Sequence, residues 1–392
     1  MAYLTPEVLK RPNLHILTDT LVESIILQKG DGTAPAQAEG VRFKAKSGER
    51  KEIPGTEVVV CGGVIQSPQI LELSGIGSSS LLKQYGIETI VDNPNVGENL
   101  QDHAIVGASF ESAIPTFDSL RDPKVAGPAF AEYKENKSGP MAFATYSAAF
   151  MPCMSLLQDN SELQQLLDDH LKDSPPEFPA QKAQYELIRE ILEDPGQSSV
   201  QYLLSPAQLA DYQSPAEVSP EARQHDYITL FASYSHPFSR GNVHINSADP
   251  TAKPTMDPKY FSHPLDAELV ARHLQYLGTI VATEPLKSLL KDDGLRIPTN
   301  FNSAVESSEG MKSFVEYGFT TYHPCGTCAM MPARLGGVVD ERLRVHGVEN
   351  LRVVDASIFP MIPRGNIVSS VYAVAERAAD LIKEDFNFGT GA

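Results

Sequence analysis

The residues best suited to chemistry lie in the last third of the sequence. His323 stands in Tyr322-His323-Pro324-Cys325-Gly326-Thr327, and Asn366 stands in Pro363-Arg364-Gly365-Asn366-Ile367. A neutral imidazole can take a proton because its pKa lies near working pH. An asparagine amide cannot take a proton there, but it can donate a hydrogen bond to an oxygen that gains negative charge. On its own, His323 would be interpreted as a core or capping histidine, so its context must decide.

The segments around these two residues are typical of a ligand site in an α/β fold. A predicted strand over 351–354 runs into Asp355-Ala356-Ser357, and a long predicted helix up to residue 379 follows Asn366. Ligands in α/β folds are held where strand ends run into helix starts. This context favours the interpretation of His323 as a pocket residue.

A second strand-to-helix connection lies far upstream. The continuous apolar run 57–61 predicts a buried parallel strand. It is followed by Gly62-Gly63 and then by Ser67-Pro68, a pair typical of a helix start, so a helix is expected over 69–73. The two glycines suit the close approach of a flat or anionic ligand, and they suit a simple turn equally well.

Three stretches, taken together, resemble the signatures of the glucose–methanol–choline (GMC) oxidoreductases, which are FAD-dependent alcohol oxidases and dehydrogenases. They are Gly62-Gly63-Val64-Ile65-Gln66-Ser67-Pro68 with its continuation to Gly77, the stretch 95–103 that ends Gln101-Asp102-His103, and the C-terminal stretch 322–379. The resemblance covers essentially the whole chain and is weakest between about 111 and 226. It implies that His323 is the catalytic base and that Asn366 is the second member of the family's His/Asn or His/His pair.

The resemblance also implies where FAD would lie. Asp355 and Ala356 match a contact near the pyrophosphate and ribityl chain, and Asn366 and Ile367 open the helix beside the isoalloxazine. The remaining implied cofactor residues are Val22, whose strand backbone touches the adenine, and the turn of Gly62 and Gly63.

The segment 93–103 matches the part of the family that passes beside the flavin and the reaction cavity, with Asn99, Asp102 and His103 in matching positions. For His103 itself, a structural hydrogen bond to Asp102 is favoured over a role beside the flavin.

One family feature is not found in the sequence. The Gly-rich fingerprint G-x-G-x-x-G, which binds the FAD pyrophosphate after an N-terminal strand, does not occur there, and the sequence opens Met1-Ala2-Tyr3-Leu4. Because that loop and the helix behind it supply much of the anion binding, we expect this chain alone to bind FAD weakly or not at all.

Three hypotheses for function follow. The first is oxidation of an alcohol by hydride transfer to FAD, with His323 as the base. The second is a flavin-free descendant that uses the same pocket for acid/base chemistry, dehydration, cyclisation or a pericyclic step on a small molecule of the secondary-metabolite kind. The third is a non-catalytic subunit completed by another chain.

The predicted fold is α/β (α+β), with an incomplete Rossmann-like FAD-binding domain and an antiparallel-sheet substrate domain covered by helices. The expected boundaries are 1–110 for the partial FAD-binding-like domain, 111–320 for the substrate-binding domain, and 321–392 for the return to the first domain with the catalytic motif. Strands are expected over 14–17, 22–27, 40–45, 227–234 and 241–245, helices over 159–173, 181–192 and 266–283, and a loop over 110–128.

Composition narrows the classes of partner. The 392 residues carry a formal net charge of −18 and a sequence pI near 5.0, which disfavours nucleic acid and anionic membrane surfaces. No apolar run reaches the length of a membrane helix and no signal peptide is visible, so a soluble, cytoplasmic protein is favoured. We expect a small-molecule substrate, and a homo-oligomer or a complementing chain that covers the exposed sheet edge.

The cysteines indicate neither a disulfide framework nor a metal site. The four cysteines are too sparse for a disulfide framework. The Cys325-x-x-Cys328 spacing lies inside the H-P-x-G-T motif and has no partner half-site, so no metal is expected.

Overall fold

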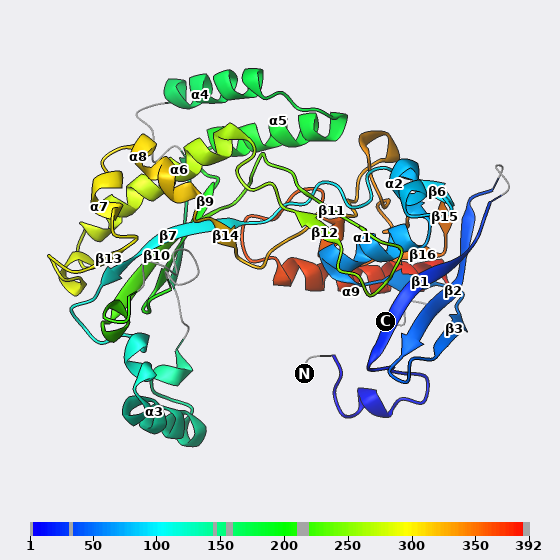
Figure 1. Cartoon of the computed structure of the whole chain (residues 1–392), viewed down its shortest axis with the longest axis horizontal. Coiled ribbons are helices and arrows are strands. Elements are labelled where there is room, and N and C mark those ends of the chain that lie inside the picture. The colour runs from blue at the N-terminus through cyan, green and yellow to red at the C-terminus, as the bar shows by residue number, and fades with distance from the viewer. Residues whose placement is uncertain (1–2, 31–33, 144–146, 154–159, 210–218, 387–392) are drawn as a thin grey trace.

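The computed structural model describes residues 3–30, 34–143, 147–153, 160–209 and 219–386. Figure 1 shows two lobes. One holds β1 to β6, α1, α2 and α9, and the other holds the largest sheet with helices α3 to α8. The long strand β7 (Ala104–Glu111) enters the second lobe from the side of the first. This arrangement agrees with the predicted mixture of an α/β part and an antiparallel sheet covered by helices.

The first lobe is built on short sheets that bring distant segments together. Strands β1 (Thr20–Gln28), β2 (Ala36–Ala45) and β3 (Arg50–Pro54) form an antiparallel meander, and β15 (Val348–Glu349) joins β2 in parallel. Strand β4 (Val58–Val60) pairs in parallel with β16 (Leu351–Val353). The pairing of β4 with β16 aligns the two predicted ligand-binding strand ends, at Gly62 and at Asp355.

Three local predictions for this lobe were wrong. Residues 14–17 form no strand. In β4 the middle residue Val59 is 39% exposed, so the strand is buried on one face only. Helix α1 spans Gly63–Leu73 and starts before Pro68, because the Ser67 hydroxyl is engaged at the preceding turn and does not cap a helix of its own.

The second lobe contains a six-stranded antiparallel sheet in the order β13, β7, β10, β9, β8, with β14 also paired to β7. The other strands are β8 (Ser147–Met151), β9 (Val200–Ser205), β10 (Tyr227–Tyr234), β13 (Arg296–Ile297) and β14 (Phe319–Thr320). Alternate residues of a strand point to opposite faces. In β10, Ile228, Leu230, Ala232 and Tyr234 belong to the main hydrophobic core, so the odd-numbered residues face away from it.

Helices cover the core face of this sheet. They include α4 (Asn160–Asp173), α5 (Pro179–Glu193), α6 (Pro264–Val281), α7 (Phe301–Ala304) and α8 (Ser308–Val315), whose apolar side chains complete the core. The three predicted helices of this region correspond to α4, α5 and α6. The predicted loop over 110–128 was wrong in part, since α3 (Pro123–Asn136) begins within it after an Asp122 cap.

The remaining elements lie between the two lobes or belong to the first lobe. Strand β11 (Asn242–His244) pairs with β12 (Thr255–Asp257) and not with the preceding β10. Helix α2 (Ser79–Gln84) and the short strands β5 (Ile76–Gly77) and β6 (Val91–Asp92) follow α1. Helix α9 (Val368–Asp385) closes the first lobe. In the described part of the chain, every helix is too short or too polar to cross a bilayer.

Candidate active site

His323 is fixed by the backbone around it. It follows β14, and Tyr322 adopts a left-handed φ of 61° that turns the chain at this point. The His323 backbone N–H donates to Asp102 Oδ1 at 3.1 Å, and the Tyr260 hydroxyl donates to Asp102 Oδ2 at 2.5 Å. Asp102 therefore holds the backbone of the predicted base and does not contact its ring.

The His323 ring makes hydrogen-bonding contacts at both nitrogens. Its Nε2 atom lies 3.2 Å from Asn366 Nδ2, and its Nδ1 atom lies 2.9 Å from Thr321 Oγ1 and 3.1 Å from His103 Nδ1. Burial lowers the pKa of His323, and the Asp102 carboxylate opposes this in part. The ring is thus favoured in its neutral form, as a proton acceptor requires.

The predicted pair opens onto one cavity. This cavity has a volume of about 270 Å³ and lies on the face of the large sheet opposite the helices. Among the described residues that line it there is no aspartate, glutamate, lysine or arginine, and His323 is the one side chain that can become charged near neutral pH. The lining residues are Ile105, Gln201, Leu203, Ser205, Leu209, Phe231, Phe319, Thr320, Thr321, Tyr322, His323 and Asn366. Such a lining suits an uncharged, mainly apolar molecule.

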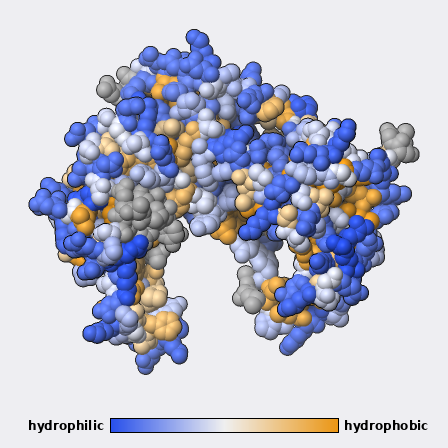
Figure 2. Space-filling view, viewed as in Figure 1, coloured by the Kyte–Doolittle hydropathy of each residue, from blue (hydrophilic) through white to orange (hydrophobic). Residues whose placement is uncertain are grey.

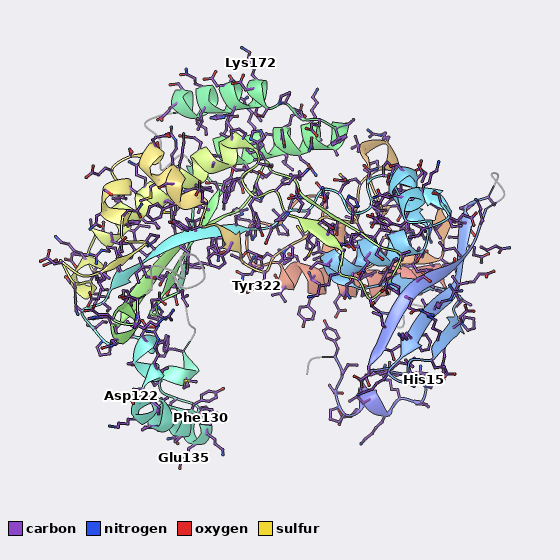
Figure 3. The ribbon with its side chains drawn as sticks, viewed as in Figure 1. His15, Asp122, Phe130, Glu135, Lys172 and Tyr322 are labelled. Atoms are coloured by element: carbon purple, nitrogen blue, oxygen red, sulfur yellow. The ribbon has the colours of Figure 1, made fainter. Side chains whose placement is uncertain are left out.

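The cavity lies where the molecule is hollowed between its lobes. Figure 2 shows a broad concavity on one side of the molecule, and Figure 3 places the labelled Tyr322 at its inner wall, near the start of α9. Tyr322 is 80% exposed, and Val368 and Tyr372 on α9 are 62% and 51% exposed. The site thus opens toward exposed apolar side chains of α9.

Asp355 organises the meeting point of β4, β16 and α1. Its Oδ2 atom accepts hydrogen bonds from the Gly63 backbone N–H at 2.9 Å and from the Ser67 hydroxyl at 2.6 Å. Its Oδ1 atom accepts from the backbone N–H and the hydroxyl of Ser357 at 2.8 and 2.5 Å. Ser67 Oγ in turn accepts from the Gly62 N–H at 3.0 Å. The amides of both glycines are therefore already paired within the protein.

The predicted cofactor residues fit one part of FAD better than another. A Cβ added to Gly63, whose φ is +74°, would meet nothing within 4 Å, so a ligand can approach this backbone closely. Ala356 is half-buried, Ile367 is buried at the start of α9, and Val22 is 36% exposed on β1. The open backbone of Gly63 leaves room for a flat ligand, whereas the amides of Gly62 and Gly63 are already paired and are not free to bind the phosphates of FAD.

The C-x-x-C pair takes no part in the site. Cys325 and Cys328 are fully buried, and burial raises the pKa of both thiols. Among the described residues, no group of three histidine, cysteine, aspartate or glutamate side chains is arranged to hold a metal ion. The two cysteines are therefore packing residues.

Comparison with models of known protein families shows which family the chain belongs to. The N-terminal and C-terminal models of the GMC oxidoreductases match residues 1–105 and 237–375. The chain belongs to the GMC oxidoreductase family. The predicted resemblance is thus confirmed over both ends of the chain, including the segments that carry Gly62, His323 and Asn366.

Related sequences support the same assignment. A dehydrogenase of Armillaria gallica is 36% identical over 96% of this GMC chain, which spans 58% of that relative. A GMC oxidoreductase family protein of Malassezia sympodialis, Mala s 12, is 36% identical over 97% of the chain, which spans 57% of it. The chain thus spans somewhat more than half the length of these relatives.

Solved structures share the fold. An FAD-dependent oxidoreductase from Chaetomium thermophilum superposes with a TM-score of 0.81 at 26% identity, covering 97% of this chain and 63% of that one. A fungal aryl-alcohol oxidase superposes with a TM-score of 0.80, also at 26% identity and with the same coverage. The arrangement of both lobes is therefore that of GMC flavoproteins.

The structure brings His323 and Asn366 together, and Ile367 follows Asn366 at the start of α9. Gly62, Gly63 and Ala356 belong to a separate group around Asp355, and Val22 lies on β1. The expected hydrogen bond between His103 and Asp102 is not the contact that the His103 ring makes: its Nδ1 lies against His323 and its Nε2 lies 3.1 Å from the Ser235 carbonyl. The sequence reasoning missed Thr321, Phe231 and Gln201. Thr321 stands two residues before His323, and this spacing was the only available signal.

Proposed function

We propose that this chain provides the substrate cavity and proton-transfer groups of a GMC oxidoreductase that oxidises the hydroxyl group of a neutral, mainly apolar alcohol. The observation that supports this most strongly is that His323 and Asn366, which lie 3.2 Å apart, open together onto an uncharged cavity. Alcohol oxidation requires a base for the hydroxyl proton and an acceptor for the carbinol hydride.

His323 would take the hydroxyl proton at its Nε2 atom, and for this the substrate hydroxyl must replace the Asn366 amide as the donor to the one lone pair of Nε2. The Asn366 amide group has two N–H donors. Once displaced from His323 Nε2, the amide can donate to the substrate oxygen as that oxygen loses its proton, which stabilises the developing negative charge. The apolar walls formed by Ile105, Leu203 and Phe231 would exclude water and hold the carbinol carbon toward α9.

FAD, when bound, supplies the hydride acceptor. The residues of this chain that would hold it are Gly63, with its open backbone, Ala356 after β16, Ile367 at the start of α9, and Val22 on β1. The chain's own contribution is to place the alcohol and its base beside that group.

The substrate class follows from the cavity. A volume of about 270 Å³ matches a molecule of roughly one ring with short substituents. Phe231 and Phe319 pack edge to face, with ring centroids 6.1 Å apart, and can offer their surfaces to an aromatic or allylic group. The relation to a fungal aryl-alcohol oxidase supports this choice.

The test is a substrate screen with the purified chain and excess FAD in the absence of oxygen. Neutral benzylic and allylic alcohols should bleach the flavin absorbance, and matched alcohols with a carboxylate or ammonium group should do so far less. Bleaching by the charged alcohols alone would contradict the proposed substrate class. Alcohol consumption without bleaching would favour the flavin-free hypothesis.

A further inference from the structure

Two histidines meet through their Nδ1 atoms behind the cavity. His103 and His323 lie with these atoms 3.1 Å apart and their ring planes at 90°. Two nitrogens at this distance share a hydrogen bond only if one carries the proton and the other presents a lone pair. The direction of this bond decides which nitrogen of His323 faces the substrate with a lone pair.

The far side of His103 determines that direction. Its Nε2 atom lies 3.1 Å from the Ser235 carbonyl oxygen, which can only accept, so Nε2 must carry the proton. His103 is 1% exposed, and burial, with the neighbouring His323 and His236, lowers its pKa to about 3. A neutral His103 with its proton on Nε2 has a bare Nδ1, which accepts from His323.

The contacts of His323 agree with this direction. The Thr321 hydroxyl donates to the His103 carbonyl at 3.0 Å, which leaves its oxygen free to accept from His323 Nδ1–H at 2.9 Å. On the cavity side, Asn366 Nδ2 can only donate, so the His323 Nε2 atom that it faces must be bare. Three neighbours on two sides of the ring thus require the same proton position.

We propose that His103 is a positioning residue that holds His323 in its Nδ1–H tautomer, so that the basic lone pair on Nε2 faces the cavity. Thr321 supports the same tautomer while its hydroxyl proton stays on the His103 carbonyl, but a hydroxyl can rotate and donate instead, so it holds the proton position less firmly than His103 does. His103 can only accept, because its own proton is committed to Ser235. The Ser235 carbonyl thus sets the tautomer of His103, and His103 in turn sets the tautomer of His323. The proposal rests on the proposed function for its use in catalysis, but the proton position is a property of the protein alone.

The direct test is nuclear magnetic resonance of the full chain with 15N-labelled histidine at pH 7.5. The His323 signals are assigned by their loss in His323→Gln. We expect Nδ1 of His323 to be of the protonated, pyrrole type and Nε2 to be of the bare, pyridine type. A protonated Nε2 in the wild-type protein would overturn the proposal, whatever the enzymatic activity is.

Two variants of His103 separate positioning from mere packing. His103→Leu removes one of the two acceptors at Nδ1 and leaves Thr321 and Asn366 in place, so His323 should populate the Nε2–H tautomer to a detectable extent, and kcat/KM for a neutral alcohol should fall about tenfold. His103→Asn places a carbonyl oxygen near the former Nδ1 position, so it should restore the Nδ1–H tautomer and most of the loss. A folded His103→Leu protein, by circular dichroism, whose His323 remains entirely Nδ1–H would overturn the proposal. If His103→Leu does not fold, His103→Asn and the wild-type spectrum still decide it.

The two proposals can fail separately. The Nδ1–H tautomer in a protein that oxidises no alcohol would contradict the proposed function and leave the role of His103 intact. Alcohol oxidation by a protein whose His323 carries its proton on Nε2 would do the reverse.

Discussion

Asp355 accepts a hydrogen bond from the backbone N–H of Gly63 at 2.9 Å, across 292 residues of sequence. The same carboxylate also binds Ser67 and Ser357. It is 7% exposed, so these donors have little access to water as an alternative partner. One side chain therefore links the two strand ends beyond the backbone ladder of β4 and β16.

We expect Asp355→Ala to lower the free energy of unfolding by about 2–4 kcal/mol, because buried donors left without an acceptor cost about 1–3 kcal/mol each. Urea denaturation followed by circular dichroism measures this. The matched control is Asp380→Ala on α9, which removes only an exposed pair with Lys383 and should change stability by less than about 1 kcal/mol. Equal effects of the two substitutions would contradict the structural role of Asp355.

Asn366 should act as a hydrogen-bond donor at the cavity. A carboxylate in its place would repel the oxygen that gains negative charge, whereas a histidine can donate. We expect Asn366→Asp to lower kcat by about 10²–10³-fold and Asn366→His to lower it clearly less. Steady-state rates of the two variants at saturating alcohol compare them. An aspartate variant as active as the wild type would argue against this role.

Buried neutral histidines should make the fold sensitive to acid. Burial lowers the pKa of His273 from 6.5 to about 3, so an unfolded chain binds a proton at this residue well before the folded one does. Its contribution to stability is fully present above pH 6.5 and is lost as the pH falls toward 3. The slope is up to about 1.4 kcal/mol per pH unit.

His273→Gln removes this titration and can keep hydrogen bonds to Ser199 and Tyr202. Denaturation curves between pH 6 and pH 4 should therefore show a shallower loss of stability in the variant than in the wild type. Identical slopes would mean that His273 does not stay neutral in the folded protein over this range.

FAD binding to this chain should be weak. The amides of Gly62 and Gly63 are paired with Ser67 and Asp355, and the sequence has no Gly-rich fingerprint to supply others for the phosphates. We expect a Kd of about 10 μM or above, which corresponds to a free energy of binding weaker than about −7 kcal/mol. Calorimetric titration with FAD, with riboflavin as the phosphate-free control, measures it. Tight, stoichiometric binding of FAD alone would show this prediction to be wrong.

The sequence predicted the family, the pair of His323 and Asn366, and the antiparallel sheet under helices, because long motifs and strand periodicity are local signals. It could not show that Asp355 binds Gly63, since that contact depends on the parallel pairing of β4 with β16. It misjudged the start of α1, because the Ser67 hydroxyl bonds to Gly62 and Asp355 and Pro68 is accommodated inside the helix. It also assigned His103 to the wrong partner, since the sequence neighbour Asp102 points to Tyr260 and the His323 backbone.

The most direct test of the central claim, that His323 is the base for alcohol oxidation, is the rate of anaerobic FAD reduction by a neutral benzylic alcohol. It is followed at the flavin absorbance with FAD in excess, for the wild type and His323→Ala, with Tyr322→Phe as the matched control that lines the same cavity. We predict reduction by the wild type that rises with pH as His323 becomes neutral, a loss of about 10²–10⁴-fold in His323→Ala, and a small change in Tyr322→Phe. An unchanged rate in folded His323→Ala, or no reduction by the wild type with any neutral alcohol, would contradict the claim.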